Sequence, residues 1–194
     1  TFHLHLEGDV AIAEEKCRGR FLPNSLFTGA ALRKPIEEGR ADFTPIFLSD
    51  IPALFTSDKV PLDAAILQLS PPDKHGYCTL GTSVDAALAA SRKAKIVIAE
   101  INERMPRTRG NTLVPFNSIT AFIHTNRPLP PHTSHGKGDA EAAIGGHIAP
   151  LIPDGATLQM GIGAIPDAVL SRLFDKRDLG VHTEMFSDRV VDLV

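Results

Sequence analysis

The chain has 194 residues, of which 43% are hydrophobic and 22% charged. It contains 20 basic and 23 acidic residues, which gives a formal net charge of −3. This composition excludes a disordered, collagen-like or coiled-coil chain. It is sufficient for a buried core in one large domain, or in one domain and part of another. Because the basic residues are scattered, we expect neither nucleic acid nor an anionic membrane surface as the main partner.

The cysteine and histidine residues form no recognisable metal or disulfide pattern. Cys17 and Cys78 are far apart without a CxxC spacing, and the histidine pairs at residues 3–5 and 132–135 lack third and fourth ligands. No run approaches the roughly 18 apolar residues of a membrane-spanning helix, and the N-terminus lacks the layout of a signal peptide. We therefore expect a cytoplasmic protein without a metal site.

Apolar runs and turn residues alternate along the first part of the chain. An alternating run at residues 2–6 and continuous runs at 44–48, 64–69 and 95–100 are predicted strands, and residues 83–93 have apolar side chains at helical spacing. Continuous apolar runs are typical of parallel strands that are covered on both sides. A helix between two such strands indicates a βαβ crossover. We therefore predict an α/β fold with open, mostly parallel sheets and helices on both faces.

A segment rich in proline and glycine, residues 127–138, divides the chain. We predict a first α/β domain over residues 1–126, which lacks its N-terminal start, and a linker over residues 127–138. Residues 139–194 are predicted to begin a second α/β domain. The chain starts at Thr1 without methionine and ends on an apolar pattern without a stop signal. We therefore expect a piece of a longer polypeptide.

The predicted second domain begins with a helix over residues 140–148, for which Asp139 is the expected N-cap. A strand at residues 157–160 then leads into a glycine loop and a helix from about residue 167 to residue 174. A further short strand is expected near Val181. The arrangement indicates successive βα units.

The strand, glycine loop and helix at residues 157–170 form the strongest local signal. Gly161 and Gly163 allow a ligand to approach the backbone closely, and free N–H groups of the loop can hold negative charge. Pro166 replaces the third glycine of the GxGxxG dinucleotide motif, and it suits the first turn of a helix. The segment predicts an anion or oxyanion site, and a plain strand-to-helix turn is the alternative.

A carboxylate, Glu184, follows the next predicted strand. Ligands of open α/β sheets gather at the carboxyl ends of strands, so Glu184 and residues 161–163 are expected to face the same crevice. A carboxylate beside an oxyanion pocket can attack an acyl group and form an anhydride or acyl-enzyme. A glutamate at a strand end is by itself more typical of a surface position, and only the pairing with the glycine loop favours a catalytic role.

Two further loops follow predicted strands. Residues 70–81 form a turn-rich segment that is long for a plain connection, and residues 100–110 contain three arginines that could meet phosphates. A structural turn and a solvated loop are the respective alternatives. The chain contains neither GxSxG nor GxxxxGK(S/T), which removes the commonest serine hydrolase and P-loop interpretations.

Four motifs, in the same order along the chain, resemble the acetyl-CoA hydrolase/transferase family of class I type CoA-transferases. They occupy residues 69–85, 99–106, 158–166 and 179–188. The resemblance extends from about Phe27 to the last residue. It implies two tandem α/β domains of CoA-transferase type, of which the second is incomplete in this chain.

The resemblance implies ping-pong exchange of CoA between an acyl-CoA thioester and a small carboxylate such as acetate, butyrate or 4-hydroxybutyrate. Glu184 would be the catalytic nucleophile and would become a glutamyl-CoA thioester. The loop that contacts CoA and supplies an oxyanion donor maps onto five residues: Gly161, Ile162, Gly163, Ala164 and Ile165. The N–H of Ile162 is the expected oxyanion donor. Coenzyme A would be a substrate, with no permanently bound cofactor, and a homo-oligomer is expected.

Two alternatives to CoA transfer stay open: an acyl-CoA hydrolase, in which water resolves the intermediate, and a non-catalytic nucleotide-binding α/β module. The chain departs from the family at Arg189, where the family has the glycine of an SDG motif, and a different local turn is expected there. Members of the family are longer and draw further contacts from their second domain. The 194-residue chain by itself is therefore expected to have little or no activity.

Overall fold

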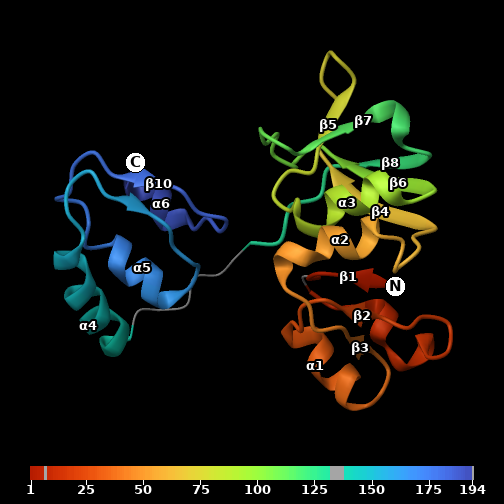
Figure 1. Cartoon of the computed structure of the whole chain (residues 1–194), viewed down its shortest axis with the longest axis horizontal. Coiled ribbons are helices and arrows are strands. Elements are labelled where there is room, and N and C mark those ends of the chain that lie inside the picture. Colours follow the sequence, from red (N-terminus) through yellow and green to blue (C-terminus); the bar gives the residue numbers. More distant parts are fainter. Residues whose placement is uncertain (7, 132–137, 194) are drawn as a thin grey trace. The chain divides into compact units, whose positions relative to one another are not determined.

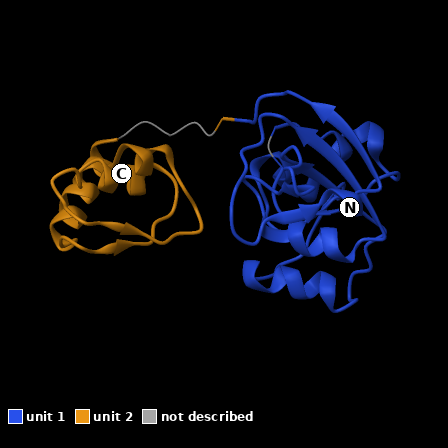
Figure 2. Cartoon of the chain, turned by 90° about the horizontal axis from the view of Figure 1, so that it is seen from above, with its two compact units in different colours: residues 1–130 blue, residues 131–194 orange. Residues whose placement is uncertain are grey.

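The computed structural model describes residues 1–6, 8–131 and 138–193. The chain divides into two compact units, unit 1 over residues 1–130 and unit 2 over residues 131–194 (Figure 2). This division falls within residues 127–138, the segment with the composition of a linker. Residues 132–137 of that segment lie outside the described residues.

Three short parallel strands begin unit 1, and their order in the sheet is β1, β2, β3 (Figure 1). They comprise Phe2–His3, Asn24–Ser25 and Asp42–Phe43. The one-turn helices η1 and η2, at Ala11–Ala13 and Glu15–Cys17, lie between β1 and β2. Helix α1 (Ala30–Glu37) connects β2 to β3, and its Leu32 packs with Ala13 and Ala41 in a small core cluster.

The structure corrects the strands expected at residues 2–6 and 44–48. Strand β1 already ends at His3, and residues 44–47 form no strand before the one-turn helix η3 at Leu48–Asp50. Pro45 offers no N–H for a ladder. Phe47 is 80% exposed, whereas Ile46 of the same run is partly buried and packs against the core cluster that contains Ile51 and Phe55.

The second sheet of unit 1 is also parallel and has the order β4, β6, β8. Its strands comprise Ala64–Leu69, Ile96–Asn102 and Ala121–Thr125. Helix α3 (Asp85–Lys93) lies between β4 and β6 in the chain, which confirms the predicted βαβ crossover. The register of β4 and β6 runs from Ala64 opposite Ile96 to Leu69 opposite Ile101.

Helix α3 covers one face of this sheet. Leu88 of α3 belongs to the same core cluster as the alternate strand residues Ala65, Leu67, Leu69, Val97, Ala99 and Ile101. Helix α2 (Ile51–Thr56) packs on α3, where Phe55 meets Ala86 and Ala89. The α3 helix therefore lies between the second sheet and α2.

The opposite face of the β4-β6-β8 sheet is exposed in the described residues. The Ile66 side chain is 82% exposed, Ile123 63% and Ile98 40%. These residues alternate with the core positions, because successive side chains of a strand point to opposite faces. The expected helices on both faces are thus found on one face of this sheet within the described part of the chain. A continuous apolar run does not predict which face of the sheet a helix covers.

Strand β5 (Tyr77–Thr79) lies within the turn-rich segment at residues 70–81 and pairs antiparallel with β7 (Leu113–Pro115). The one-turn helix η4 (Phe116–Ser118) follows β7. This pairing was not predicted, because three-residue strands are too short to show a periodic pattern.

The described residues of unit 2 form two parallel strands and three α-helices. They are α4 (Asp139–Ile148), β9 (Thr157–Leu158), α5 (Ala164–Leu170), β10 (Gly180–Val181) and α6 (Asp188–Leu193), with a one-turn helix η5 at Ala149–Leu151. The N-cap of α4 is Gly138, and Asp139 is the first helical residue instead of the cap. Helix α5 begins three residues earlier than expected, and Pro166 lies in its first turn as predicted.

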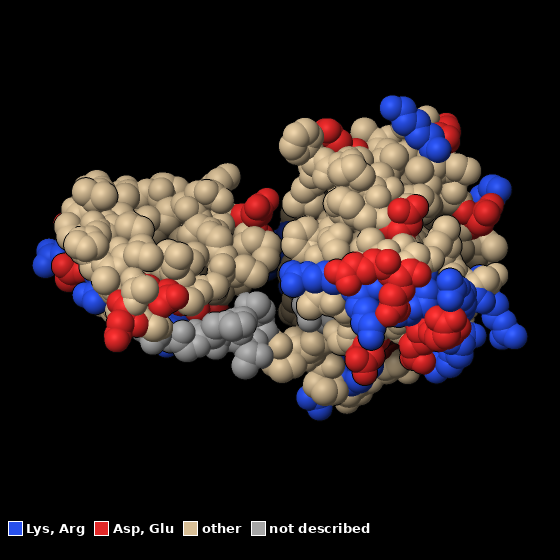
Figure 3. Space-filling view, turned by 90° about the horizontal axis from the view of Figure 1, so that it is seen from below, with Lys and Arg blue, Asp and Glu red and all other residues tan. Residues whose placement is uncertain are grey.

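Charged side chains of both signs are intermixed on the face of unit 1 that Figure 3 shows. Unit 1 carries exposed ion pairs such as Lys16–Glu14 at 2.7 Å and Arg18–Glu15 at 3.1 Å. Nucleic-acid-binding surfaces instead carry a stripe of positive charge. Within the described ranges, no helix has both the length and the apolar character needed to cross a membrane.

Candidate functional site

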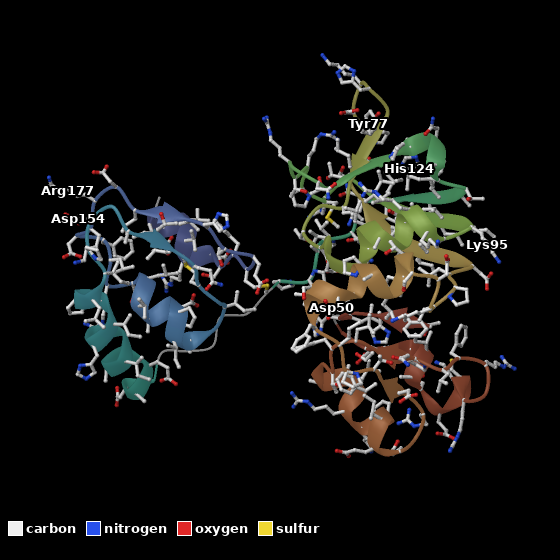
Figure 4. All side chains as sticks on the ribbon, viewed as in Figure 1. Asp50, Tyr77, Lys95, His124, Asp154 and Arg177 are labelled. Atoms are coloured by element: carbon white, nitrogen blue, oxygen red, sulfur yellow. The ribbon has the colours of Figure 1, made fainter. Side chains whose placement is uncertain are left out.

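Asp154 and Arg177 mark the amino ends of β9 and β10. Figure 4 shows them together at one end of unit 2, and the Arg177 N–H donates to the Asp154 carboxylate at 2.9 Å. Because the two strands are parallel, the carboxyl ends of both strands lie at the end of the sheet that is opposite to Asp154 and Arg177. The glycine loop follows one of these ends, and Glu184 follows the other.

The ladder between the strands fixes which residues lie side by side. The N–H of Gly180 donates to the carbonyl of Ala156, and the N–H of His182 donates to the carbonyl of Leu158, both at 2.9 Å. Gly180 lies opposite Thr157, and Val181 lies opposite Leu158.

A side chain extends this pairing past the ends of both strands. The Thr183 hydroxyl donates to the carbonyl of Met160 at 2.6 Å and accepts a hydrogen bond from the Met160 N–H at 3.3 Å. Glu184 is the residue after Thr183, and Gly161 is the residue after Met160. The structure thus brings the candidate nucleophile and the start of the glycine loop to neighbouring strand ends. Sequence reasoning did not single out Thr183, although a hydroxyl directly before the candidate nucleophile was a usable signal.

The five predicted loop residues lie between β9 and the first turn of α5. Gly161, Ile162 and Gly163 form the loop, whereas Ala164 and Ile165 are the first two residues of α5. Gly163 has φ +117°, which favours glycine. A Cβ on Gly161 or Gly163 would meet no atom within 4 Å, so the space beside the loop backbone is open to a ligand.

The Glu184 side chain is exposed, and Ile162 and Ile165 of the loop are 38% and 45% exposed. The predicted site is therefore accessible in unit 2. A surface cavity of about 530 Å³ lies elsewhere, in unit 1, where residues including Val10 and Arg40 line it. That cavity contains no residue of the predicted site.

The carboxyl ends of β4, β6 and β8 carry a polar cluster. Glu100 of β6 accepts hydrogen bonds from Gln68 of β4 at 3.1 Å, from Thr125 of β8 at 2.7 Å and from the Arg127 guanidinium at 2.7 Å. The hydrogen bonds from Arg127 are the main reason that the pKa of Glu100 is lowered to about 2. The cluster ties three strands together. It was not predicted, since Arg127 was assigned to the linker.

The turn-rich segment at residues 70–81 is held by its own side chains. The Asp73 carboxylate accepts the N–H groups of Tyr77 and His75 at 2.9 Å each, and the Arg107 guanidinium donates to it at 2.6 Å. The hydrogen bond from the Tyr77 N–H is the main cause of a lowered Asp73 pKa. These bonds support the interpretation of residues 70–81 as a structural turn, and they give Arg107 a partner that neither the phosphate-contact nor the solvated-loop interpretation predicted.

The histidines and cysteines of the described residues form no metal site. Among the residues that the structure describes, no three or more His, Cys, Asp or Glu side chains form a group that could hold a metal ion. The histidines at 132 and 135 lie outside the described residues. Cys17 and Cys78 are free thiols, and burial raises the pKa of Cys78.

Arg189 lies in helix α6 and not in a turn. Its guanidinium contacts the Asp192 carboxylate at 3.0 Å within the helix. A helical position does not need the conformational freedom of glycine. The structure therefore accommodates an arginine directly after Asp188.

Comparison with known proteins gives a match to one family model. The model for the "Acetyl-CoA hydrolase/transferase N-terminal domain" matches residues 9–130. The chain is 50% identical over 194 residues to a succinyl-CoA:acetate/propanoyl-CoA:succinate CoA transferase of Fasciola hepatica, covering all of this chain and 40% of that protein. It is 45% identical over 192 residues to a 4-hydroxybutyrate coenzyme A transferase of Clostridium kluyveri, covering 99% of this chain and 45% of that protein.

Solved structures also match most of this chain. RipA from Yersinia pestis matches with a TM-score of 0.87 and 32% identity over 94% of this chain and 44% of that chain. A 4-hydroxybutyrate CoA-transferase from Porphyromonas gingivalis matches with a TM-score of 0.76 and 37% identity over 92% and 47%. The chain therefore spans less than half the length of the relatives that it matches.

Proposed function

Since the chain belongs to the acetyl-CoA hydrolase/transferase family, we propose that the whole protein is a CoA-transferase with Glu184 as its nucleophile. One observation supports this role above others. Glu184 and the glycine loop follow the carboxyl ends of neighbouring parallel strands, and the Thr183 hydroxyl hydrogen-bonds Met160 just before them. Strand ends of this kind are where ligands bind in open α/β sheets.

The proposed reaction starts when the Glu184 carboxylate attacks the thioester carbonyl of an acyl-CoA. The carbon–sulfur bond breaks, CoA leaves as a thiolate, and an acyl-glutamyl anhydride forms. The thiolate then attacks the glutamyl carbonyl, which releases the acyl group as a free carboxylate and leaves a glutamyl-CoA thioester. The acceptor carboxylate passes through the same two steps in reverse, and Glu184 is regenerated as CoA departs on the acceptor.

The glycine loop would stabilise the negative charge that develops on the carbonyl oxygen. We assign the N–H of Ile162 as the oxyanion donor, and the loop from Gly161 through Gly163 to Ala164 and Ile165 as a contact for CoA. A preorganised N–H donor contributes about 3 kcal/mol to such a transition state. A thioester resists a dilute carboxylate, so the positioning of Glu184 would supply a further part of the rate.

Coenzyme A is the proposed co-substrate, without a permanently bound cofactor, and the acyl groups are those of small carboxylates. The relatives are named for succinyl-CoA, acetate, propanoyl-CoA and 4-hydroxybutyrate, and we propose acetate, butyrate or 4-hydroxybutyrate type substrates here. We further propose a cytoplasmic homo-oligomer. In it, residues 1–126 form a first domain, residues 127–138 a linker, and residues 139–194 the start of a second CoA-transferase domain.

The decisive experiment is mass spectrometry of the whole protein after incubation with acetyl-CoA. We expect CoA attached at Glu184, and we expect Glu184→Gln to lose both this adduct and transfer to acetate. The matched control is Glu141→Gln, which makes the same chemical change on helix α4 and should keep both. Undiminished transfer by Glu184→Gln would remove the proposed function.

A further inference from the structure

At Thr183 the main-chain hydrogen bonds that pair β9 with β10 are replaced by hydrogen bonds to a side chain. In a parallel ladder, the N–H of every second residue of one strand donates to the neighbouring strand. Gly180 and His182 follow this rule, and Glu184 is the next donor of the series, with the Met160 carbonyl as its acceptor. That carbonyl instead accepts the Thr183 hydroxyl, and among the described residues no hydrogen bond joins it to the Glu184 N–H.

A single side chain thus satisfies both polar groups of Met160. The Thr183 hydroxyl contacts the Met160 carbonyl at 2.6 Å and the Met160 N–H at 3.3 Å. Two main-chain bonds would hold the strands at ladder spacing, whereas a side-chain hydroxyl lets the backbones separate without leaving these groups unpaired. Thr183 is half-buried, while Glu184 beyond it is exposed.

We propose that Thr183 is a positioning residue that sets Glu184 against the glycine loop. This inference rests on the proposed function, because it concerns Glu184 as the nucleophile. The hydroxyl ends the ladder one residue before both Glu184 and Gly161, and it keeps the two strand ends in register where they must admit an acyl group. Thr183 acts through Met160 and Glu184 and has no contact with the reacting atoms in this role.

The test compares one variant that removes the Thr183 hydroxyl but keeps the shape of the side chain with another that keeps the hydroxyl. In Thr183→Val the hydroxyl is replaced by a methyl group, and a nucleophile misplaced by about 1 Å can lose about 100-fold in rate. We expect kcat to fall at least about 10-fold while the KM for acetyl-CoA changes less than about 2-fold, since substrate binding is not the step affected. Thr183→Ser retains the hydroxyl and should restore most of kcat.

Thr157→Val is the matched control at the other end of the same strand pair. Thr157 lies opposite Gly180, and its hydroxyl makes no hydrogen bond to the described residues. The same methyl-for-hydroxyl change there should leave kcat and KM unaltered. A loss shared by the Thr157 and Thr183 variants would indicate a general weakening of the strand pair and overturn the positioning role.

The remaining outcomes separate this inference from the proposed function. Wild-type kcat in Thr183→Val, with Glu184→Gln inactive, overturns the role of Thr183 and leaves the nucleophile in place. Full activity of Glu184→Gln overturns the proposed function instead. Should the valine variant not fold, Thr183→Ala takes its place, and equal activity of the alanine and serine variants overturns the role.

Discussion

Gly145 of α4 lies directly against the backbone carbonyl of Ala168 in α5. A Cβ on Gly145 would stand 2.7 Å from that oxygen, well inside van der Waals contact. The neighbouring Gly146 faces a different surface, where the nearest atoms belong to the Arg172 side chain at 3.6 Å. The α4 backbone therefore lies in close contact with α5 at Gly145, and this contact helps to position the helix that follows the glycine loop.

We predict opposite effects for alanine at these two adjacent glycines. Gly145→Ala should lower the stability of unit 2 by about 2 kcal/mol, because the α4 and α5 backbones must move apart. Gly146→Ala should raise it by about 0.5–1 kcal/mol through helix propensity. Amide hydrogen exchange of α4 in the whole protein measures both. Equal protection of the α4 amides from exchange in the two variants would show that the close approach at Gly145 does not affect the stability of unit 2.

Alanine substitutions in the glycine loop separate ligand approach from backbone strain. Gly161 has an ordinary φ and open space around its missing Cβ, so Gly161→Ala should leave the melting temperature unchanged. Because we propose that CoA approaches this backbone, the same variant should raise the KM for acetyl-CoA about 10-fold, the effect of about 1.4 kcal/mol. An unaltered KM would argue against CoA contact at Gly161.

Gly163 provides the contrasting case. Its φ of +117° is rarely adopted by other residues, so Gly163→Ala should reduce the stability of unit 2 by about 1–3 kcal/mol even without a ligand. Thermal unfolding of the whole protein without substrate gives the comparison with Gly161→Ala. If the two variants unfold at the same temperature, the conformation of Gly163 is not a constraint on the loop.

The choice between transfer and hydrolysis can be made by omitting the acceptor. A glutamyl-CoA thioester that is protected from water waits for a carboxylate, so we expect CoA exchange to require acetate or a similar acceptor. The assay follows free CoA and acyl-CoA products of the whole protein with and without acetate. Undiminished release of free CoA without acetate would favour an acyl-CoA hydrolase.

The Glu100–Arg127 pair predicts an acid-dependent loss of stability in unit 1. The pKa of Glu100 is lowered from 4.5 to about 2, so its contribution is fully present above pH 4.5 and is lost as the pH falls toward 2. Since Arg127 is 57% exposed, we discount this contribution for solvent screening to about 1 kcal/mol. Glu100→Gln should therefore be less sensitive than the wild type to acidification between these values.

Tyr77 offers a convenient signal for this measurement. It is the one tyrosine of the 194-residue chain, which has no tryptophan, so its fluorescence during urea unfolding of this chain reports on unit 1. Glu103→Gln is the control, because Glu103 is exposed and its side chain makes no hydrogen bond to the described residues. An equal acid response of the Glu100 variant and the wild type would contradict the prediction.

Local pattern was enough for the elements whose apolar spacing is long and regular. The strands at residues 64–69 and 95–100, the helix between them and the parallel α/β class are all found in the structure. Pattern failed at the short strands β3 and β5, which leave no period, although it located the comparably short β9 and β10. It also failed at residues 44–48, where the apolar run forms no strand although Ile46 packs against a core cluster.

The sequence likewise predicted some features of the candidate site and not others. The residue types were enough to nominate Glu184 and the glycine loop, because a carboxylate paired with a glycine loop after successive strands favours acyl chemistry. Their relation in space depends on the register of β9 and β10, and on the Thr183 hydroxyl that continues it at Met160. Hydrogen bonds between residues 23 positions apart arise only when the chain folds, so no local spacing could reveal them.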